Sequence, residues 1–261
     1  MAVTNFIQQI WSKKIQDDLE LKCKLVDNCL RDYEGDCKYA QSVKILGVGE
    51  PTIGAYDGTK DITIEDMSDK GQILTIDQAN YFAFYVDDID QAQSVPGLKE
   101  KYQAKAVHGL AVARDTFVAE LIASATNATP IGAMTEEGVK KAVDAAIVAL
   151  RERNCDEDGV IEMTPAFYNL FKYHLITLST NNPELIRKGV VGMYDNFECI
   201  MSNNLKTPCD IRGKKAIAFA GQINEVEALR AEKRFKDIVR GLDTFGAKVI
   251  DEARIQKLTS A

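Results

Sequence analysis

The amino-acid sequence predicts an α+β fold in which one long helix accompanies several short strands and helices. Three observations lead to this prediction. An amphipathic pattern opens the chain, a glycine-rich and acidic segment separates short alternating strands, and a long apolar stripe of helical period precedes many short elements of both kinds. With 261 residues, 46% hydrophobic and 27% charged, the chain suffices for one large domain or two small ones sharing a core.

Residues 6–26 have the apolar spacing of an amphipathic helix. The apolar positions recur at steps of three and four, at Phe6, Ile7, Ile10, Trp11, Ile15 and Leu19, and then at Leu21, Leu25 and Val26. The pattern breaks at residues 33–36. Such a segment, which carries the chain's only tryptophan, must place its apolar face on its own core or on a neighbouring molecule.

A long β-hairpin is predicted between two short strands at residues 42–46 and 73–77, with a further strand at 81–86. The connecting segment, residues 47–71, contains glycines and the acidic residues Asp57, Asp61, Glu65, Asp66 and Asp69. Its apolar residues exceed what an isolated two-stranded ribbon can bury, namely Ile53, Ile62, Ile64 and Met67. Because long segments of this kind are uncommon inside compact chains and usually functional, we expect the hairpin to project from the body.

The longest predicted helix begins at Pro96 and ends between Asn127 and Pro130. Its expected apolar stripe comprises Tyr102, Ala106, Leu110, Ala113, Phe117 and Leu121. At about 1.5 Å per residue this helix is on the order of 40 Å long, which is longer than a small core requires. We therefore expect it to act as a spine.

A second, mixed unit follows Pro130. Thr135 is expected to cap a helix whose buried face is Val139, Ala142, Val143, Ala146, Ile147 and Leu150. A strand at 160–163 leads into a helix opened by Thr164 and Pro165, and Asn182–Pro183 repeats this device. Strands are expected at 197–201 and 216–220. From Ile223 the sequence predicts another helix-like stretch, and then strands at 234–239 and 247–250 around Gly246.

Charge and targeting signals favour a soluble protein made in the cytoplasm. The net charge is −7 and the sequence pI about 5.1, which disfavours a broad basic surface for nucleic acid but permits a container that encloses DNA without adhering to it. No apolar run approaches the roughly 20 residues that span a bilayer, and no basic n-region or cleavage site opens the chain. The six cysteines form no CxxC pair, so we expect free thiols packed as small hydrophobic groups.

No metal or phosphate site is predicted. Residues 154–165 begin like a calcium-binding EF-hand loop, but Pro165 stands where the closing bidentate Glu belongs. The glycines at 47, 49 and 54 follow a strand without a helix behind them, and Gly213 precedes two lysines without the rest of a phosphate loop. We interpret all three as turns.

No catalytic set is predicted either. His108 lies one step off the stripe of the long helix, and His174 lies on an aromatic helix face, so neither has the setting of a catalytic base. The carboxylates of Asp87, Asp88 and Asp90 follow a strand and precede a helix, where capping and turn formation account for them. The sequence therefore predicts no enzyme, no cofactor and no metal ion.

The order of these parts resembles the Hong Kong 97 fold of the major capsid proteins of tailed bacteriophages. Local sequence agrees at residues 6–15, at 31–35 and at 43–45. The most specific stretch is 74–88, and residues 235–249 resemble the closing signature of the family. By this likeness residues 1–39 form the N-arm, 40–80 the extended β-hairpin called the E-loop, 81–129 the P-domain with its spine helix, 130–222 the inserted A-domain, and 223–261 the returning part of the P-domain.

The resemblance implies a coat protein that self-assembles through hexamers and pentamers into an icosahedral shell around the double-stranded DNA genome of a phage. Its expected partners are other copies of the chain, a portal, a separate scaffolding protein or none, and packaged DNA through weak non-specific contact, with no membrane. The expected location is the virion capsid, after assembly in the bacterial host cytoplasm. Residues of the arm and loop are expected to make the contacts between subunits: Phe6, Ile10, Trp11, Ile53, Ile62, Ile64 and Met67.

Two alternatives stay open at this point. An encapsulin-type nanocompartment resembles the same fold but encloses cargo enzymes instead of DNA. The other alternative is a cytosolic enzyme whose site the sequence does not reveal.

Overall fold

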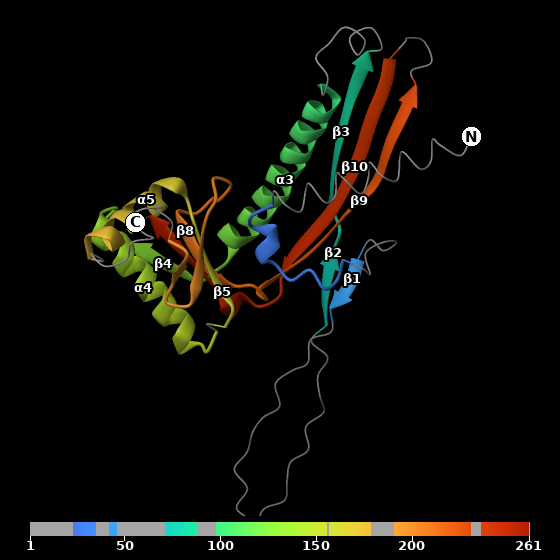
Figure 1. Cartoon of the computed structure of the whole chain (residues 1–261). Helices are drawn as coiled ribbons and strands as arrows, with labels where there is room; N and C mark the ends of the chain where they lie inside the picture. Colours follow the sequence, from blue (N-terminus) through green and yellow to red (C-terminus); the bar gives the residue numbers. More distant parts are fainter. Residues whose placement is uncertain are drawn as a thin grey trace, which may run out of the picture.

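The protein is elongated, with two sheet units that meet near the carboxyl end of one long helix (Figure 1). The computed structural model describes residues 23–34, 42–45, 71–87, 98–155, 157–178, 191–230 and 236–260. None of the helices in these ranges is long and apolar enough to cross a lipid bilayer.

The first unit is a three-stranded antiparallel sheet in the order β3-β10-β9, with α3 (Leu98–Ser124) against one face (Figure 1). Its strands are β3 (Gln78–Asp87), β10 (Lys236–Val249) and β9 (Ile217–Arg230). Rings from the sheet and the helix interlock: Phe84 stacks on Tyr102 and Phe245 meets Phe117 edge to face. The 27-residue α3 is the long helix that the sequence predicts.

The buried face of α3 differs from the predicted stripe. Of the six residues expected there, Leu110 alone is fully buried, and Tyr102 is exposed. The buried positions are Val107, Leu110, Ala111, Arg114, Asp115, Val118, Ala119 and Ile122. The predicted face is therefore rotated about the helix axis relative to the observed one. The reason is that Arg114 and Asp115, which a hydrophobic pattern assigns to the outside, have buried partners and lie at the centre of the observed face.

The second unit is a six-stranded mixed sheet in the order β4-β11-β8-β5-β7-β6, covered on one face by α4 (Glu136–Glu152) and α5 (Pro165–Leu178). Its strands are β4 (Ala128–Ile131), β11 (Ile255–Ser260), β8 (Cys209–Gly213), β5 (Gly159–Met163), β7 (Phe197–Met201) and β6 (Met193–Tyr194). The central strands β5 and β8 are buried at every position, because α4 and α5 cover one face and residues 25–28 bond to Glu162 and Arg212 on the other.

Helix α4 confirms the sequence reading in detail. The Thr135 hydroxyl accepts the N–H of Gly138, and the six residues predicted for the buried face are the six that are buried. Pro165 opens α5 as expected, but the Thr164 hydroxyl donates to the carbonyl of Pro208 on the neighbouring loop. The helix predicted at Asn182–Pro183 lies outside the described residues.

Three other predictions of secondary structure were wrong. The helix-like stretch after Ile223 is part of the continuous strand β9, and the two strands predicted around Gly246 are one strand, β10. Residues 223–230 contain helix-favouring Glu, Ala, Leu and Arg, but pairing with β10 along its length overrides that weak preference. The N-terminal helix does not continue through Val26 either, because residues 24–30 form bends and the single 3-10 turn η1 (Val26–Asn28).

A separate two-stranded ribbon, β1 (Ser42–Ile45) with β2 (Gln72–Thr75), lies against the start of β9 and the end of β10 (Figure 1). Its apolar side chains Val43, Ile45 and Leu74 pack on Ala218 and Ala220. Gly246 permits this close approach, since a Cβ there would lie 2.1 Å from the Thr75 carbonyl oxygen.

Candidate assembly interface

The base of the predicted hairpin is firmly attached to the body. Ser42 pairs with Thr75 and Ile45 with Gln72, so residues 46–71 connect two antiparallel strands. The Gln72 amide donates to the Ile250 carbonyl at 2.9 Å, and the Lys248 ammonium donates to the Ile73 carbonyl at 2.9 Å. These bonds and the apolar contacts with β9 fix where the connecting residues leave the body.

The seven residues predicted to make subunit contacts lie outside the described residues: Phe6, Ile10, Trp11, Ile53, Ile62, Ile64 and Met67. The structure therefore describes only the points at which their two segments join the body. These are residues 23–30 for the arm and the ribbon of β1 and β2 for the loop.

An exposed aromatic and apolar surface lies on the three-stranded sheet, on the face away from α3. Tyr81 is 81% exposed and Tyr85 66%, and both point away from the helix because β3 alternates its side chains. Leu242 on β10 is the directly paired neighbour of Tyr81 and is 39% exposed. We call Tyr81, Tyr85 and Leu242 the open face. The sequence reading missed it because both alternating positions of β3 carry aromatic rings, so either side could have been the core.

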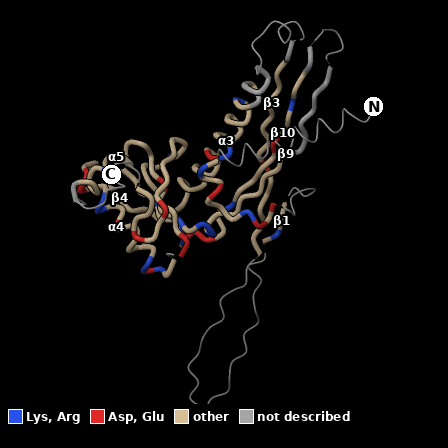
Figure 2. The backbone as a smooth tube through the Cα atoms, viewed as in Figure 1, with Lys and Arg blue, Asp and Glu red and all other residues tan. Residues whose placement is uncertain are grey.

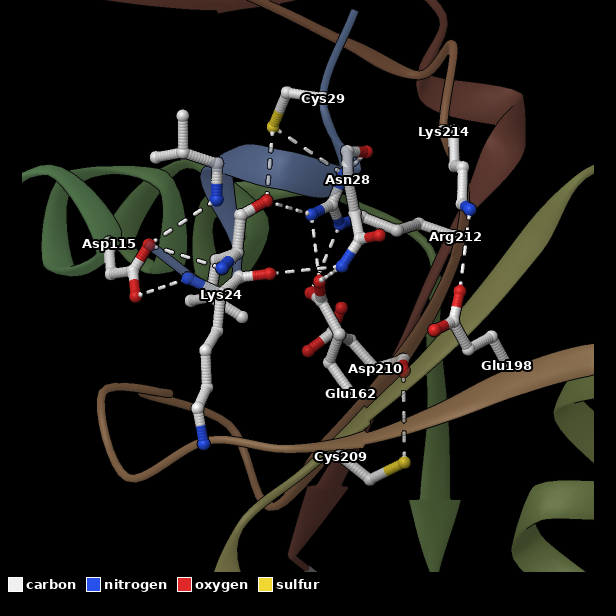
Figure 3. Close-up of polar contacts among 12 residues, drawn as sticks. Lys24, Asn28, Cys29, Asp115, Glu162, Glu198, Cys209, Asp210, Arg212 and Lys214 are labelled. Carbon is white, nitrogen blue, oxygen red and sulfur yellow. Dashed lines mark hydrogen bonds and ion pairs between the residues drawn. The ribbon is translucent and has the colours of Figure 1, made fainter. Parts of the chain in front are cut away.

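Residues 23–30, which we call the root of the N-terminal segment, are bound by a buried carboxylate on α3. The side chain of Asp115 accepts the backbone N–H groups of Lys24, Leu25 and Val26 at 3.1, 3.1 and 3.3 Å (Figure 3). Burial raises the pKa of Asp115, and these three N–H bonds act in the opposite direction. Because these N–H groups bond to α3, they are unavailable for a helix, which explains the bend observed here.

The same root is held from the other side by Arg212 on β8. Its guanidinium donates to the carbonyls of Leu25 and Asn28, both at 2.8 Å, and pairs with Glu162 on β5 at 2.8 and 3.1 Å (Figure 3). Burial lowers the pKa of Arg212, but the opposing effects of Glu162, Cys29 and Asp210 together exceed it, and the pKa lies above its ordinary value. The root therefore joins α3 to the six-stranded sheet.

Sequence reasoning missed these polar residues. The available signal was charge within short buried strands: Glu162 interrupts an apolar run, and Asp210 and Arg212 alternate with Cys209 and Ile211. Charged residues are almost never fully buried unless paired, so such a pattern indicates a partner across the sheet.

The thiols in the described residues are free, and four of the five are buried. Burial raises the pKa of Cys23 to about 12, of Cys29 to about 11 and of Cys199 to about 12. Such thiols are almost wholly protonated near neutral pH and are poor nucleophiles and metal ligands. Within the described ranges no three His, Cys, Asp or Glu residues converge as a metal site.

Charge is mixed over the described surface. Figure 2 shows acidic and basic residues interspersed along α3 and around the six-stranded sheet. His108 is exposed on α3 and His174 is partly exposed on α5. Neither the surface of α3 nor that of the six-stranded sheet resembles a basic groove for nucleic acid.

Comparison with known proteins identifies the fold. No protein-family model matches the sequence, and no curated protein matches it. Among solved structures, a chain of Mycobacterium phage Che8 is similar with a TM-score of 0.78 and 24% identity over 90% of each chain. A chain from the capsid of the Cyanophage P-SCSP1u has a TM-score of 0.74 and 16% identity, over 89% of this chain and 86% of that one. The chain has the Hong Kong 97-like capsid fold.

In this capsid fold α3 is the spine helix, as the resemblance in sequence implied. The fold also occurs outside these phages. The virus-like particle from Pyrococcus furiosus is similar with a TM-score of 0.61 and 13% identity, over 97% of this chain and 99% of that one.

Proposed function

We propose that the protein is a coat protein that assembles through hexamers and pentamers into an icosahedral shell enclosing the double-stranded DNA of a phage. The observation that carries this proposal is the TM-score of 0.78 over 90% of both chains, because it leaves little of the sequence for another domain. The described residues also offer no converging metal ligands, and burial raises the pKa of the thiols of Cys23, Cys29 and Cys199.

The open face is the proposed docking surface for the hairpin of a neighbouring subunit. Tyr81, Tyr85 and Leu242 present apolar surface on the subunit, and the loop carries Ile53, Ile62, Ile64 and Met67, which a ribbon alone has no means to bury. Large interfaces between permanent partners bury mostly apolar surface of this type. The arm residues Phe6, Ile10 and Trp11 are proposed to contact a neighbouring copy as well.

The domain divisions predicted from the sequence are part of the same proposal. Helix α3, β3 and β10 would be the P-domain, α4, α5 and β5 to β8 the A-domain, and β1 with β2 the base of the E-loop. Strand β11 belongs to the six-stranded sheet although it follows residue 223, so the two domains would share the end of the chain.

Packaged DNA would touch the shell only weakly. The net charge of −7 and the mixed charges in Figure 2 support few phosphate contacts, and binding of DNA through such contacts is lost rapidly with added salt. A portal and a separate scaffolding protein are proposed partners for assembly in the host cytoplasm, and no membrane is involved.

An encapsulin-type shell around cargo enzymes is the second candidate, favoured by the near-complete coverage of the Pyrococcus furiosus particle. The two are separated by purifying particles from the cells that naturally produce the protein and treating them with nuclease. DNA of one defined length that survives nuclease supports the phage shell. Particles that hold a single abundant protein and no protected DNA support the encapsulin, and the absence of any particle contradicts both.

A further inference from the structure

A fully buried group of three charged residues lies where the root of the N-terminal segment meets the six-stranded sheet. Glu162 on β5 and Asp210 and Arg212 on β8 are each 0% exposed. Glu162 and Asp210 are direct partners in the antiparallel pairing of the two strands, so their carboxyl groups are on the same face of the sheet. Figure 3 shows the two carboxyls close together beneath the root.

The charges of this group do not balance. Arg212 forms its ion pair with Glu162, and neither carboxyl oxygen of Asp210 receives a hydrogen bond from any described residue. Two ionised carboxylates beside one guanidinium, all three side chains fully buried, would be strongly unfavourable.

Other cations near the group are engaged elsewhere. Lys257, the partner of Asp210 on β11, donates its ammonium to the Ala123 carbonyl of α3 at 2.6 Å. Lys24 on the root donates to the Met201 carbonyl, and Lys214 pairs with Glu198. The remaining titratable groups around it are the carboxyl of Asp115 on α3 and the buried thiols of Cys29 and Cys209, none of which supplies positive charge.

We infer that Asp210 is protonated in the folded protein and donates a hydrogen bond to Glu162, and that this neutral pair is a proton-dependent latch holding residues 24–30 on the sheet. With the proton in place, Glu162 is free to keep Arg212 oriented toward the Leu25 and Asn28 carbonyls, and it also accepts from the Asn28 amide at 3.4 Å. When the proton passes to a base in solvent, the two carboxylates repel and compete for one guanidinium. Water can reach them when residues 24–30 move away.

The direction of the pH dependence follows from the burial. Burial first, and Glu162 second, raise the pKa of Asp210 well above its usual 3.8. The latched state therefore binds one more proton than the released state at any pH between the two pKa values. Its stabilisation is complete below about pH 4 and is lost progressively as the pH rises toward the raised pKa.

Hydrogen–deuterium exchange of the peptide covering residues 23–34 tests the latch in the full-length chain. After correction for the intrinsic exchange rate, release of the Asp210 proton should lower the protection as the pH rises above about pH 4, by up to about tenfold per pH unit, because release is coupled to loss of one proton. Asp210→Asn keeps the shape of the side chain and a donor toward Glu162 but needs no added proton. In this variant the exchange protection of the same peptide should therefore fall less steeply with pH than in the wild type. The raised pKa of Asp115 acts equally in both proteins and cancels in the comparison.

The matched control is Glu198→Gln, which removes an exposed carboxylate from the same sheet and should leave the slope as in the wild type. Equal slopes in the wild type and Asp210→Asn would overturn the inference. If the variant does not fold, infrared spectra decide: at about pH 5–6, where ordinary carboxyls are ionised, the folded Asp115→Asn protein must contain a protonated-carboxyl band that vanishes on unfolding. The absence of that band would equally overturn it. This test does not depend on shell formation, so its failure would leave the proposed function untouched.

Discussion

Arg114 on the spine helix and Asp243 on β10 form a buried ion pair with two hydrogen bonds, of 3.0 and 2.5 Å. The Arg114 guanidinium also lies over the rings of Phe219 and Phe245, 5.6 and 5.9 Å from their centroids. Asp243 is located where the pairing of β10 with β9 shifts register. The Arg114–Asp243 ion pair therefore connects the helix to the sheet at this bulge.

Replacing Arg114 with Met should destabilise the subunit by about 3–5 kcal/mol, because it leaves the Asp243 carboxylate buried without a partner. Urea unfolding measures the loss. The double variant Arg114→Met with Asp243→Leu should recover much of it, since neither charge then remains buried. Lys206→Met, which removes the exposed partner of Glu120 on the same helix, is the control and should cost less than about 1 kcal/mol. Equal effects of the two single variants would contradict this account.

Gly246→Ala should displace the hairpin base. The added Cβ would lie 2.1 Å from the Thr75 carbonyl and 2.9 Å from the Ile76 Cα, and backbone cannot yield as a flexible side chain can. We expect a lower melting temperature and faster proteolysis near β2. Gly109→Ala on α3 meets nothing within 4 Å and should instead stabilise by roughly 0.5–1 kcal/mol. A Gly246→Ala protein as stable as the wild type would show that β2 is not packed as described.

The buried thiols should resist alkylation. With pKa values of about 12 for Cys23 and about 11 for Cys29, the reactive thiolate becomes abundant only as the pH approaches those values. Iodoacetamide labelling at about pH 8, followed by peptide mass spectrometry, should modify both much more slowly in the native protein than in denaturant. Native labelling at the rate of the denatured chain would contradict their burial.

Removing the rings of the open face should block assembly without unfolding the subunit. Tyr81 and Tyr85 are largely exposed, so Tyr81→Ser with Tyr85→Ser removes little core packing, and the melting temperature should change by only a few degrees. Particle yield by sedimentation should fall strongly. Tyr173→Ser, which alters an exposed tyrosine on α5, is the control and should assemble normally. Normal assembly of the double variant would exclude the open face as a docking surface.

Deleting residues 49–71 should leave a folded subunit that does not assemble. The ribbon of β1 and β2 packs on Ala218 and Ala220 through residues outside the deletion, so a cooperative thermal transition should persist. Calorimetry and sedimentation measure the two outcomes separately. Loss of the thermal transition would mean that the deleted residues belong to the core.

Sequence pattern predicted those elements whose burial follows local periodicity. Helix α4 is the clear case, because Thr135 caps it and an ordinary apolar face packs on the sheet. The pattern failed where distant partners decide. Arg114 and Asp115 are buried because of Asp243 and the root, and residues 223–230 are a strand because β10 lies alongside. The latch depends on pairing of strands 50 residues apart in the chain, which no local spacing reveals.

Electron microscopy of the purified full-length protein, with its scaffolding protein where one exists, shows whether the subunits form a shell. We expect hollow icosahedral particles, in whose reconstruction the spine helix and both sheets repeat in hexamers and pentamers. We also expect the hairpin of a neighbour to cover the open face of each subunit. A protein that is well folded but strictly monomeric under every assembly condition would contradict the proposed assembly.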